Sequence, residues 1–89
     1  MSSYLLIRHK VRDFSMWKTG YDAHLPKRVE AGLTEAHFFQ NSSDLNEVII
    51  LFKAEDLGRA KTFTESADLR EIMQKLGVID KPNIYFLTE

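Results

Sequence analysis

The stretch EVIILFK at residues 47–53 decides the fold of this chain. Side chains alternate between the two faces of a strand, so its apolar residues fall on both faces: Val48, Ile50 and Phe52 on one, Ile49 and Leu51 on the other. A strand that is apolar on both faces must be covered on both faces. The rest of the 89 residues supplies about two helices, enough for one face of a sheet, and the stretch therefore predicts a second subunit on the other.

The composition limits the class of protein. A chain of 89 residues is expected to form one domain, residues 1–89, of a size that often depends on disulfides, a metal or oligomerisation. It contains no cysteine, which excludes disulfides and suits a reducing compartment. The net charge is -1 and like charges do not cluster, so the sequence shows no basic patch that would bind nucleic acid or a membrane surface. No apolar run approaches ~18 residues and no secretory segment is evident, so we expect a cytoplasmic protein.

The hydrophobic pattern predicts the order strand, helix, strand, strand, helix, strand. The elements are expected at residues 4–11, 13–31, 34–41, 47–54, 56–76 (two helical segments) and 84–88. Asp13, Asp56 and Ser66 are expected helix N-caps, and Pro26 predicts a kink or break near His24. This order is typical of an α+β, ferredoxin-like βαββαβ fold, with a four-stranded antiparallel sheet and its helices on one face. The apolar helix-free face predicts a homodimer in which two sheets pack together.

Several segments resemble the dimeric α/β-barrel superfamily, which includes the antibiotic biosynthesis monooxygenases. They are HKVRDF at 9–14 with Trp17 and Tyr21-Asp22, NEV at 46–48, SADLREIM at 66–73, and Gly77-Val78 with Pro82 and the strand 84–87. The resemblance covers almost the whole chain and implies a dimeric α/β barrel. For function it implies a cofactor-independent monooxygenase acting on a small aromatic or polyketide-like substrate. Haem degradation is not implied, because the first strand lacks the Asn, and the helix at 66–76 the His, that haem-degrading relatives use.

Two histidines are candidates for a catalytic base. His9 lies between Ile7 and Val11 on an apolar strand face, where it is either a hydrogen-bonded core residue or a base for a phenol or enol. His24 precedes the break at Pro26 and is a candidate for the mouth of a pocket. The alternative for His24 is a partly exposed residue at the helix break without a role in a site. For each histidine the structural and the functional interpretation stay open.

Aromatic residues and a third histidine complete the predicted substrate site. Trp17 and Tyr21 lie one helical turn apart and either fill the core or form a pocket wall. Phe63 and Tyr85 are further candidates, with the hydroxyl of Tyr21 or Tyr85 donating to a developing oxyanion. His37 is on an expected edge strand and belongs either to the site or to the dimer interface.

The three histidines have no metal-ligand spacing, so we expect no metal and no cofactor. Two functions of different class remain. The first is an enzyme with a pocket between the sheet and the Trp17 helix. The second is a non-catalytic dimeric small-molecule-binding or scaffolding module, which predicts a pocket filled by the protein's own side chains.

Overall fold

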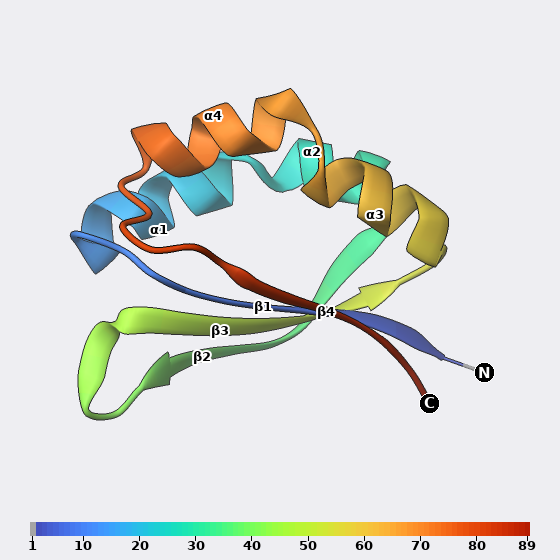
Figure 1. The fold of residues 1–89 in the computed structure, drawn as a ribbon, viewed down its shortest axis with the longest axis horizontal. Coiled ribbons are helices and arrows are strands. Elements are labelled where there is room, and N and C mark those ends of the chain that lie inside the picture. The colour runs from blue at the N-terminus through green and yellow to red at the C-terminus, as the bar shows by residue number, and fades with distance from the viewer. Residues whose placement is uncertain (1) are drawn as a thin grey trace.

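The computed structural model describes residues 2–89, and its elements follow the predicted order. The strands are β1 (Ser3–Lys10), β2 (Leu33–Asn41), β3 (Asp44–Ala54) and β4 (Asn83–Thr88). The helices are α1 (Phe14–Ala23), α2 (Leu25–Glu30), α3 (Leu57–Thr64) and α4 (Ala67–Lys75). The strands form one antiparallel sheet in the order β2-β3-β1-β4, and the helices cover one of its faces (Figure 1). The predicted ferredoxin-like fold is confirmed.

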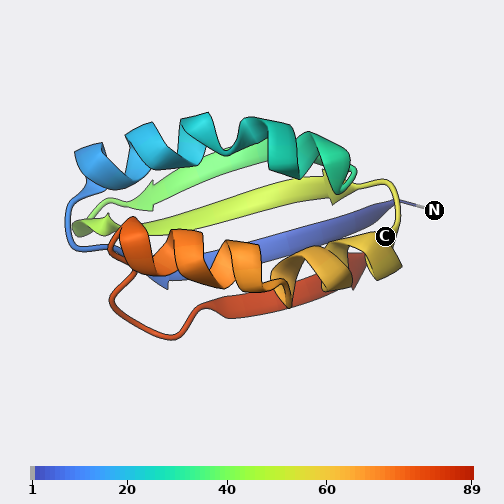
Figure 2. The same cartoon turned by 90° about the horizontal axis from the view of Figure 1, so that it is seen from above.

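The helices form two rows above the sheet (Figure 2). One row, α1 followed by α2, lies on the side of β2, and the other, formed by α4 and α3, lies on the side of β4. Each row consists of two short helices with a change of direction between them. None of the helices within residues 2–89 has the length and apolar character needed to cross a membrane.

The register of the sheet decides which side of the central strand meets the helices. Ile7 of β1 pairs with Ile50 of β3, and both are buried. The helix-covered side of β3 is therefore the set Val48, Ile50 and Phe52, each at most 2% exposed. Ile49 and Leu51 lie on the helix-free face and are half-buried. The sequence predicted the two sets, and the register assigns each set to its face.

The helix predicted over residues 13–31 is two helices. Asp13 caps α1 as expected, since its carboxylate accepts a hydrogen bond from the amide of Met16 at 3.2 Å. Pro26 lies in the first turn of α2, where its missing N–H costs no helical hydrogen bond. The chain changes direction at His24, between α1 and α2, and Gly32, with a φ of 76°, follows the second helix. The predicted break is confirmed, and it turns the ring of His24 toward α3.

A bulge in β2 changes which side chains of that strand meet the helices. Ala36 is the extra residue, because the pairing with β3 shifts between Glu35 and His37. Glu35 consequently shares the helix-covered face with Phe38, whereas His37 and Phe39 lie on the opposite face. Strict alternation would have placed Glu35 beside His37.

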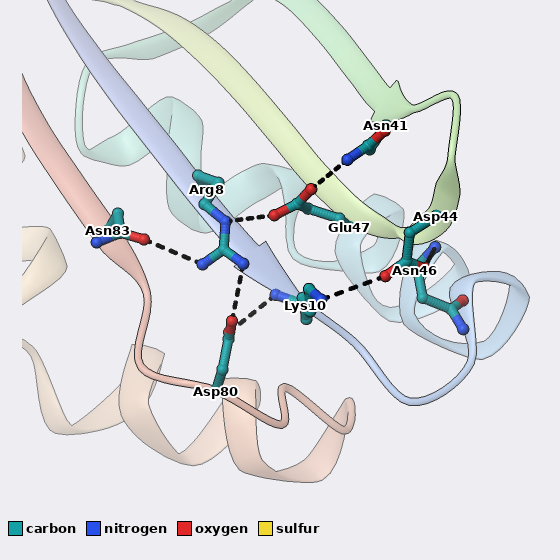
Figure 3. A network of polar contacts seen from close by, with 8 residues as sticks. All are labelled: Arg8, Lys10, Asn41, Asp44, Asn46, Glu47, Asp80 and Asn83. Atoms are coloured by element: carbon teal, nitrogen blue, oxygen red, sulfur yellow. Dashed lines mark hydrogen bonds and ion pairs between the residues drawn. The ribbon is translucent and has the colours of Figure 1, made fainter.

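The helix-free face combines exposed apolar side chains with an ionic cluster at one end. Phe39, Tyr85 and Leu87 are 53%, 52% and 39% exposed. At the end near the hairpin, Arg8 contacts Glu47 at 2.7 Å and Asp80 at 3.0 Å (Figure 3). The cluster ties the loop that precedes β4 to β1 and β3, and it leaves the apolar part of the face uncovered by this chain.

Candidate functional site

Aromatic rings fill the space between α1 and the sheet. Trp17 and Tyr21 are 3% and 7% exposed, and their rings stack with centroids 4.9 Å apart. Phe38 of β2 packs against both rings. Trp17 and Tyr21 also line an inner cavity between the helices and the sheet. The sequence left open whether Trp17 and Tyr21 fill the core or form a pocket wall. In the structure both residues do both.

The two ring nitrogens of His9 have no hydrogen-bond partner. Among residues 2–89 they are the only buried side-chain nitrogen or oxygen atoms of which this is true. The side chain is 3% exposed and meets the ring of Trp17 edge-on, with centroids 5.4 Å apart. Burial is the main cause that lowers the pKa of His9 from 6.5 to about 4, so the ring is neutral at neutral pH. The predicted burial is confirmed, whereas the structure gives His9 no hydrogen-bond partner in the protein. An unpaired buried polar group costs roughly 1–3 kcal/mol, which calls for a functional explanation.

Tyr21 is held by two residues that the sequence did not single out. Its hydroxyl donates to Oε1 of Glu35 at 2.7 Å, and burial raises its pKa. The guanidinium carbon of Arg28 lies 3.8 Å from the centroid of the Tyr21 ring, and Nη1 donates to the Tyr21 carbonyl at 2.6 Å. Arg28 is 6% exposed and places a positive charge beside the carbonyl end of α1, where the helix dipole favours a cation. The hydroxyl of Tyr21 is thus occupied by Glu35, and this hydrogen bond fixes the Tyr21 ring in the wall of the inner cavity.

His24 lies where the two helical rows approach each other. Its ring centroid is 6.1 Å from that of Phe63 on α3. Burial lowers the pKa of His24, and the nearby cation of Arg28 acts in the same direction. Unlike His9, His24 is half-buried and therefore within reach of a molecule that approaches from solvent.

Two spaces meet at His24. The inner cavity, of about 50 Å³, lies between the sheet and the helices and is walled by His9, Trp17 and a set of mainly apolar residues. The outer groove, of about 610 Å³, lies between α2 on one side and α3 with the start of α4 on the other. The residues that line both spaces are His24, Phe63 and Leu69. These three side chains lie at the boundary between a small apolar cavity and a larger groove, which charged residues such as Lys27 and Asp68 also line.

Two weak contacts cross the outer groove. Nζ of Lys27 on α2 lies 3.8 Å from Oδ2 of Asp68 on α4, and Arg59 of α3 donates to the carbonyl of Glu30. All the side chains involved are largely exposed, and such contacts contribute about 0–1 kcal/mol each. An incoming molecule can therefore displace them at small cost.

The structure brings together five of the seven residues predicted for the site. The inner cavity is lined by His9, Trp17, Tyr21, His24 and Phe63. His37 and Tyr85 lie elsewhere: they pair with Leu51 and Leu6, respectively, on the helix-free face. His37 stacks on Phe39 there, with ring centroids 5.7 Å apart. Among residues 2–89 no group of three His, Asp or Glu side chains is arranged to hold a metal ion.

By sequence, no family model and no curated protein matches the chain. Solved structures match its fold over nearly its whole length. SnoaB, a cofactor-independent oxygenase from Streptomyces nogalater, is 8% identical with a TM-score of 0.76, covering 99% of this chain and 92% of that one. A proposed antibiotic biosynthesis monooxygenase from Bordetella bronchiseptica is 14% identical with a TM-score of 0.76, covering 100% and 98%.

A conserved protein from Methanosarcina mazei is 12% identical with a TM-score of 0.73, covering 98% of this chain and 91% of that chain. At these identities the likeness concerns the fold. The resemblance inferred from the sequence is confirmed at that level: the chain has the fold of proteins described as antibiotic biosynthesis monooxygenases.

Proposed function

We propose that the protein is a cofactor-independent oxygenase that oxidises a small aromatic or polyketide-like substrate. The observation that carries this proposal is the position of His24 between the outer groove and the inner cavity. The groove, at about 610 Å³, lies within the range of roughly 300–1,000 Å³ that is usual for small-molecule sites. The fold shared with SnoaB, which is described as a cofactor-independent oxygenase, adds support.

In this proposal His24 is the general base. Its lowered pKa keeps the ring neutral at neutral pH, ready to accept a proton. Burial is the first cause of that pKa; Arg28 and Lys27 act in the same direction and Asp68 opposes them. The two cations also favour the anion that the substrate becomes when it loses its proton. His9, which is fully buried and away from the groove, is left for a different role.

The reaction is written for a substrate carbon that carries two acidic hydrogens, as in an anthrone. His24 takes one proton, and the electron pair left on the carbon forms a C–O bond with dioxygen, giving a peroxide anion. The proton returns from His24 to the outer oxygen. The O–O bond then breaks, and the second hydrogen leaves with that oxygen as water, so that a carbonyl group remains. One dioxygen is consumed and one water is formed for each carbonyl.

We further infer that the protein is a homodimer through the helix-free face of the sheet. Exposed apolar side chains on that face, among them Phe39, Tyr85 and Leu87, support this inference, because soluble monomers seldom expose contiguous patches of this kind. In such a dimer His37 lies in the interface, away from the groove and the inner cavity.

A non-catalytic binding module is the second candidate, and one observation favours it. The space beside Trp17 is nearly filled by the protein's own side chains, with only about 50 Å³ left. In this alternative the outer groove binds a small molecule and His24 takes no proton.

Oxygen uptake on a panel of anthrone-like and hydroquinone compounds separates the two candidates. The oxygenase proposal expects one dioxygen consumed per quinone formed, and a loss of about 10²-fold or more in rate for His24→Ala. The rate should rise with pH through a midpoint below 6.5, because the pKa of His24 is lowered. Binding of the same compounds without oxygen uptake, followed by the fluorescence of Trp17, would favour the binding module.

A further inference from the structure

The inner cavity is much smaller than a site for an aromatic substrate. Its volume of about 50 Å³ compares with about 610 Å³ for the groove on the other side of His24 and Phe63. It holds a few small molecules at most, since one water needs roughly 10–15 Å³ of such volume. The two spaces therefore suit guests of very different size.

The walls of the inner cavity are almost entirely apolar, and the polar side chains among the lining residues are those of His9, Tyr21, His24 and Arg28. Most of the wall is aliphatic or aromatic, including Ile7, Ile50 and Ile72. The Tyr21 hydroxyl donates to Glu35, and Arg28 donates to the Tyr21 carbonyl. A stable water needs two to four polar partners, and apolar cavities without them stay dry and take apolar guests such as xenon. The cavity therefore suits a small apolar molecule.

We propose that this cavity is the dioxygen-binding site of the protein, while the outer groove takes the organic substrate. The inference rests on the proposed oxygenase function and adds the location of its second reactant. Dioxygen is a small apolar molecule that matches both the size and the walls of the cavity. Phe63, Leu69 and His24 line both spaces, so the substrate carbon and dioxygen meet at the histidine that removes the proton.

His9 then stabilises the reduced oxygen. Neutral dioxygen is a poor hydrogen-bond acceptor, whereas the peroxide anion formed by the carbon electron pair is a strong one. A neutral imidazole has one N–H to donate. Its hydrogen bond to the peroxide is made only after electrons have moved, and an interaction of this kind lowers a reaction barrier. The role accounts for a histidine that is 3% exposed and has no partner in the protein.

Xenon is the probe for the cavity. Methyl NMR spectra of the intact protein under xenon pressure should show shifts at Ile7, Ile50 and Ile72, which line the cavity. Ile72→Phe should fill the space and abolish these shifts. Gln74→Phe places the same side chain on the exposed side of α4 and is the matched control, with shifts as in the wild type. In turnover, Ile72→Phe should raise the KM for dioxygen about tenfold or more and leave the KM for the organic substrate unchanged.

His9→Leu tests the proposed role of His9 as a hydrogen-bond donor to the peroxide. This variant stays informative even if Ile72→Phe fails to fold. It keeps the apolar wall, so xenon should still bind, and it removes an unpaired buried group, so the thermal midpoint should rise. Its kcat/KM for dioxygen should fall about 10²-fold, as for the loss of one oxyanion donor. The midpoint of the pH profile should stay where His24 sets it.

Three results would overturn the inference: absence of xenon shifts at the cavity wall, an ordered water bound to His9 that xenon does not displace, or an unchanged KM for dioxygen in a folded Ile72→Phe. If the oxygenase proposal itself is wrong, the experiments should give a different pattern of results. Xenon would then bind at the wall in the wild type and in Gln74→Phe, while no compound of the panel is oxidised by either protein.

Discussion

The two faces of the sheet are built from alternating residues of the same strands, yet each leaves a different kind of group without a partner. On the helix-covered face Ile50 and Phe52 are both 2% exposed, and the unpartnered group is the polar ring of His9. On the helix-free face the charged groups near the hairpin are paired with one another, and large apolar groups are left uncovered, such as Phe39 at 53% exposure. An unpartnered polar group in an apolar cavity suits chemistry, whereas an uncovered apolar surface suits assembly.

The largest effect should come from a core residue of the helix-covered face. Phe52→Ala removes a ring that is 2% exposed, and such a change costs about 3–5 kcal/mol of the free energy of unfolding. Urea denaturation at a fixed protein concentration measures it. Lys53→Ala, one residue along on the opposite face and exposed, is the control and should stay within about 0.5 kcal/mol of the wild type. A loss below about 1 kcal/mol for Phe52→Ala would mean that helix packing is looser than described.

The second effect is a dependence of stability on pH that originates at His9. The pKa is about 4 in the folded protein and 6.5 when the ring is free, so the unfolded chain binds more protons between these values. The free energy of unfolding should therefore fall as the pH is lowered from 6.5 to 4, with a steepest slope of about 1.4 kcal/mol per pH unit and a total loss of about 3 kcal/mol.

Burial dominates this shift, and the charges of Asp80 and Arg8 add smaller, opposing effects. Denaturation of wild type and His9→Leu at matched pH values isolates the contribution of the histidine from that of the carboxylates. The two proteins should diverge progressively below pH 6.5. Parallel curves would show that His9 gains a proton acceptor or a solvent path in the folded protein.

The third effect concerns assembly through the helix-free face. Leu51→Lys places a charge at the centre of that face, opposite Leu6 and His37, and should weaken association about 100-fold, which corresponds to roughly 2.8 kcal/mol. Sedimentation equilibrium measures it, with circular dichroism to verify that the variant is folded. Met16→Lys introduces the same charge on α1, at the other side of the sheet and at a position that is 70% exposed, and should leave the dimer intact. A wild type that is monomeric at micromolar concentration would contradict the inferred homodimer.

The smallest effect should come from the hydroxyl of Tyr21. Tyr21→Phe removes its hydrogen bond to Glu35 and should cost about 1 kcal/mol of the free energy of unfolding. Tyr85→Phe, on the opposite face and 52% exposed, should change it by less than about 0.5 kcal/mol. Equal effects of the two substitutions would show that the Tyr21–Glu35 contact contributes nothing.

The sequence predicted those features that depend on local chemistry. Asp13, Asp56 and Ser66 cap α1, α3 and α4 as expected, because N-capping depends on a side chain and an amide three residues away. The two faces of β1 and β3 also followed from alternation. For the site, the same local patterns identified the residues of α1 and β1 that line the inner cavity.

Features that depend on the packing of distant elements were not predictable. The bulge at Ala36, which brings Glu35 under Tyr21, follows from the pairing of β2 with β3 and has no local signal. Arg28 is buried because α2 continues the row begun by α1, and the Arg28 side chain reaches back to the Tyr21 carbonyl. The spacing of seven residues between Tyr21 and Arg28 is at most a weak sequence signal for this contact. The hairpin was expected to have a longer turn, but Ser42 and Ser43 alone form it.

The separation of chemistry from assembly is tested most directly by comparing histidines from the two faces in one assay. Oxygen uptake with the anthrone-like and hydroquinone panel should fall about 10²-fold or more in His24→Ala. The same measurement on His37→Ala, verified to be dimeric, should give the wild-type rate, because His37 lies on the face opposite the groove. Equal losses in the two variants, or oxidation that is indifferent to His24→Ala, would contradict the account.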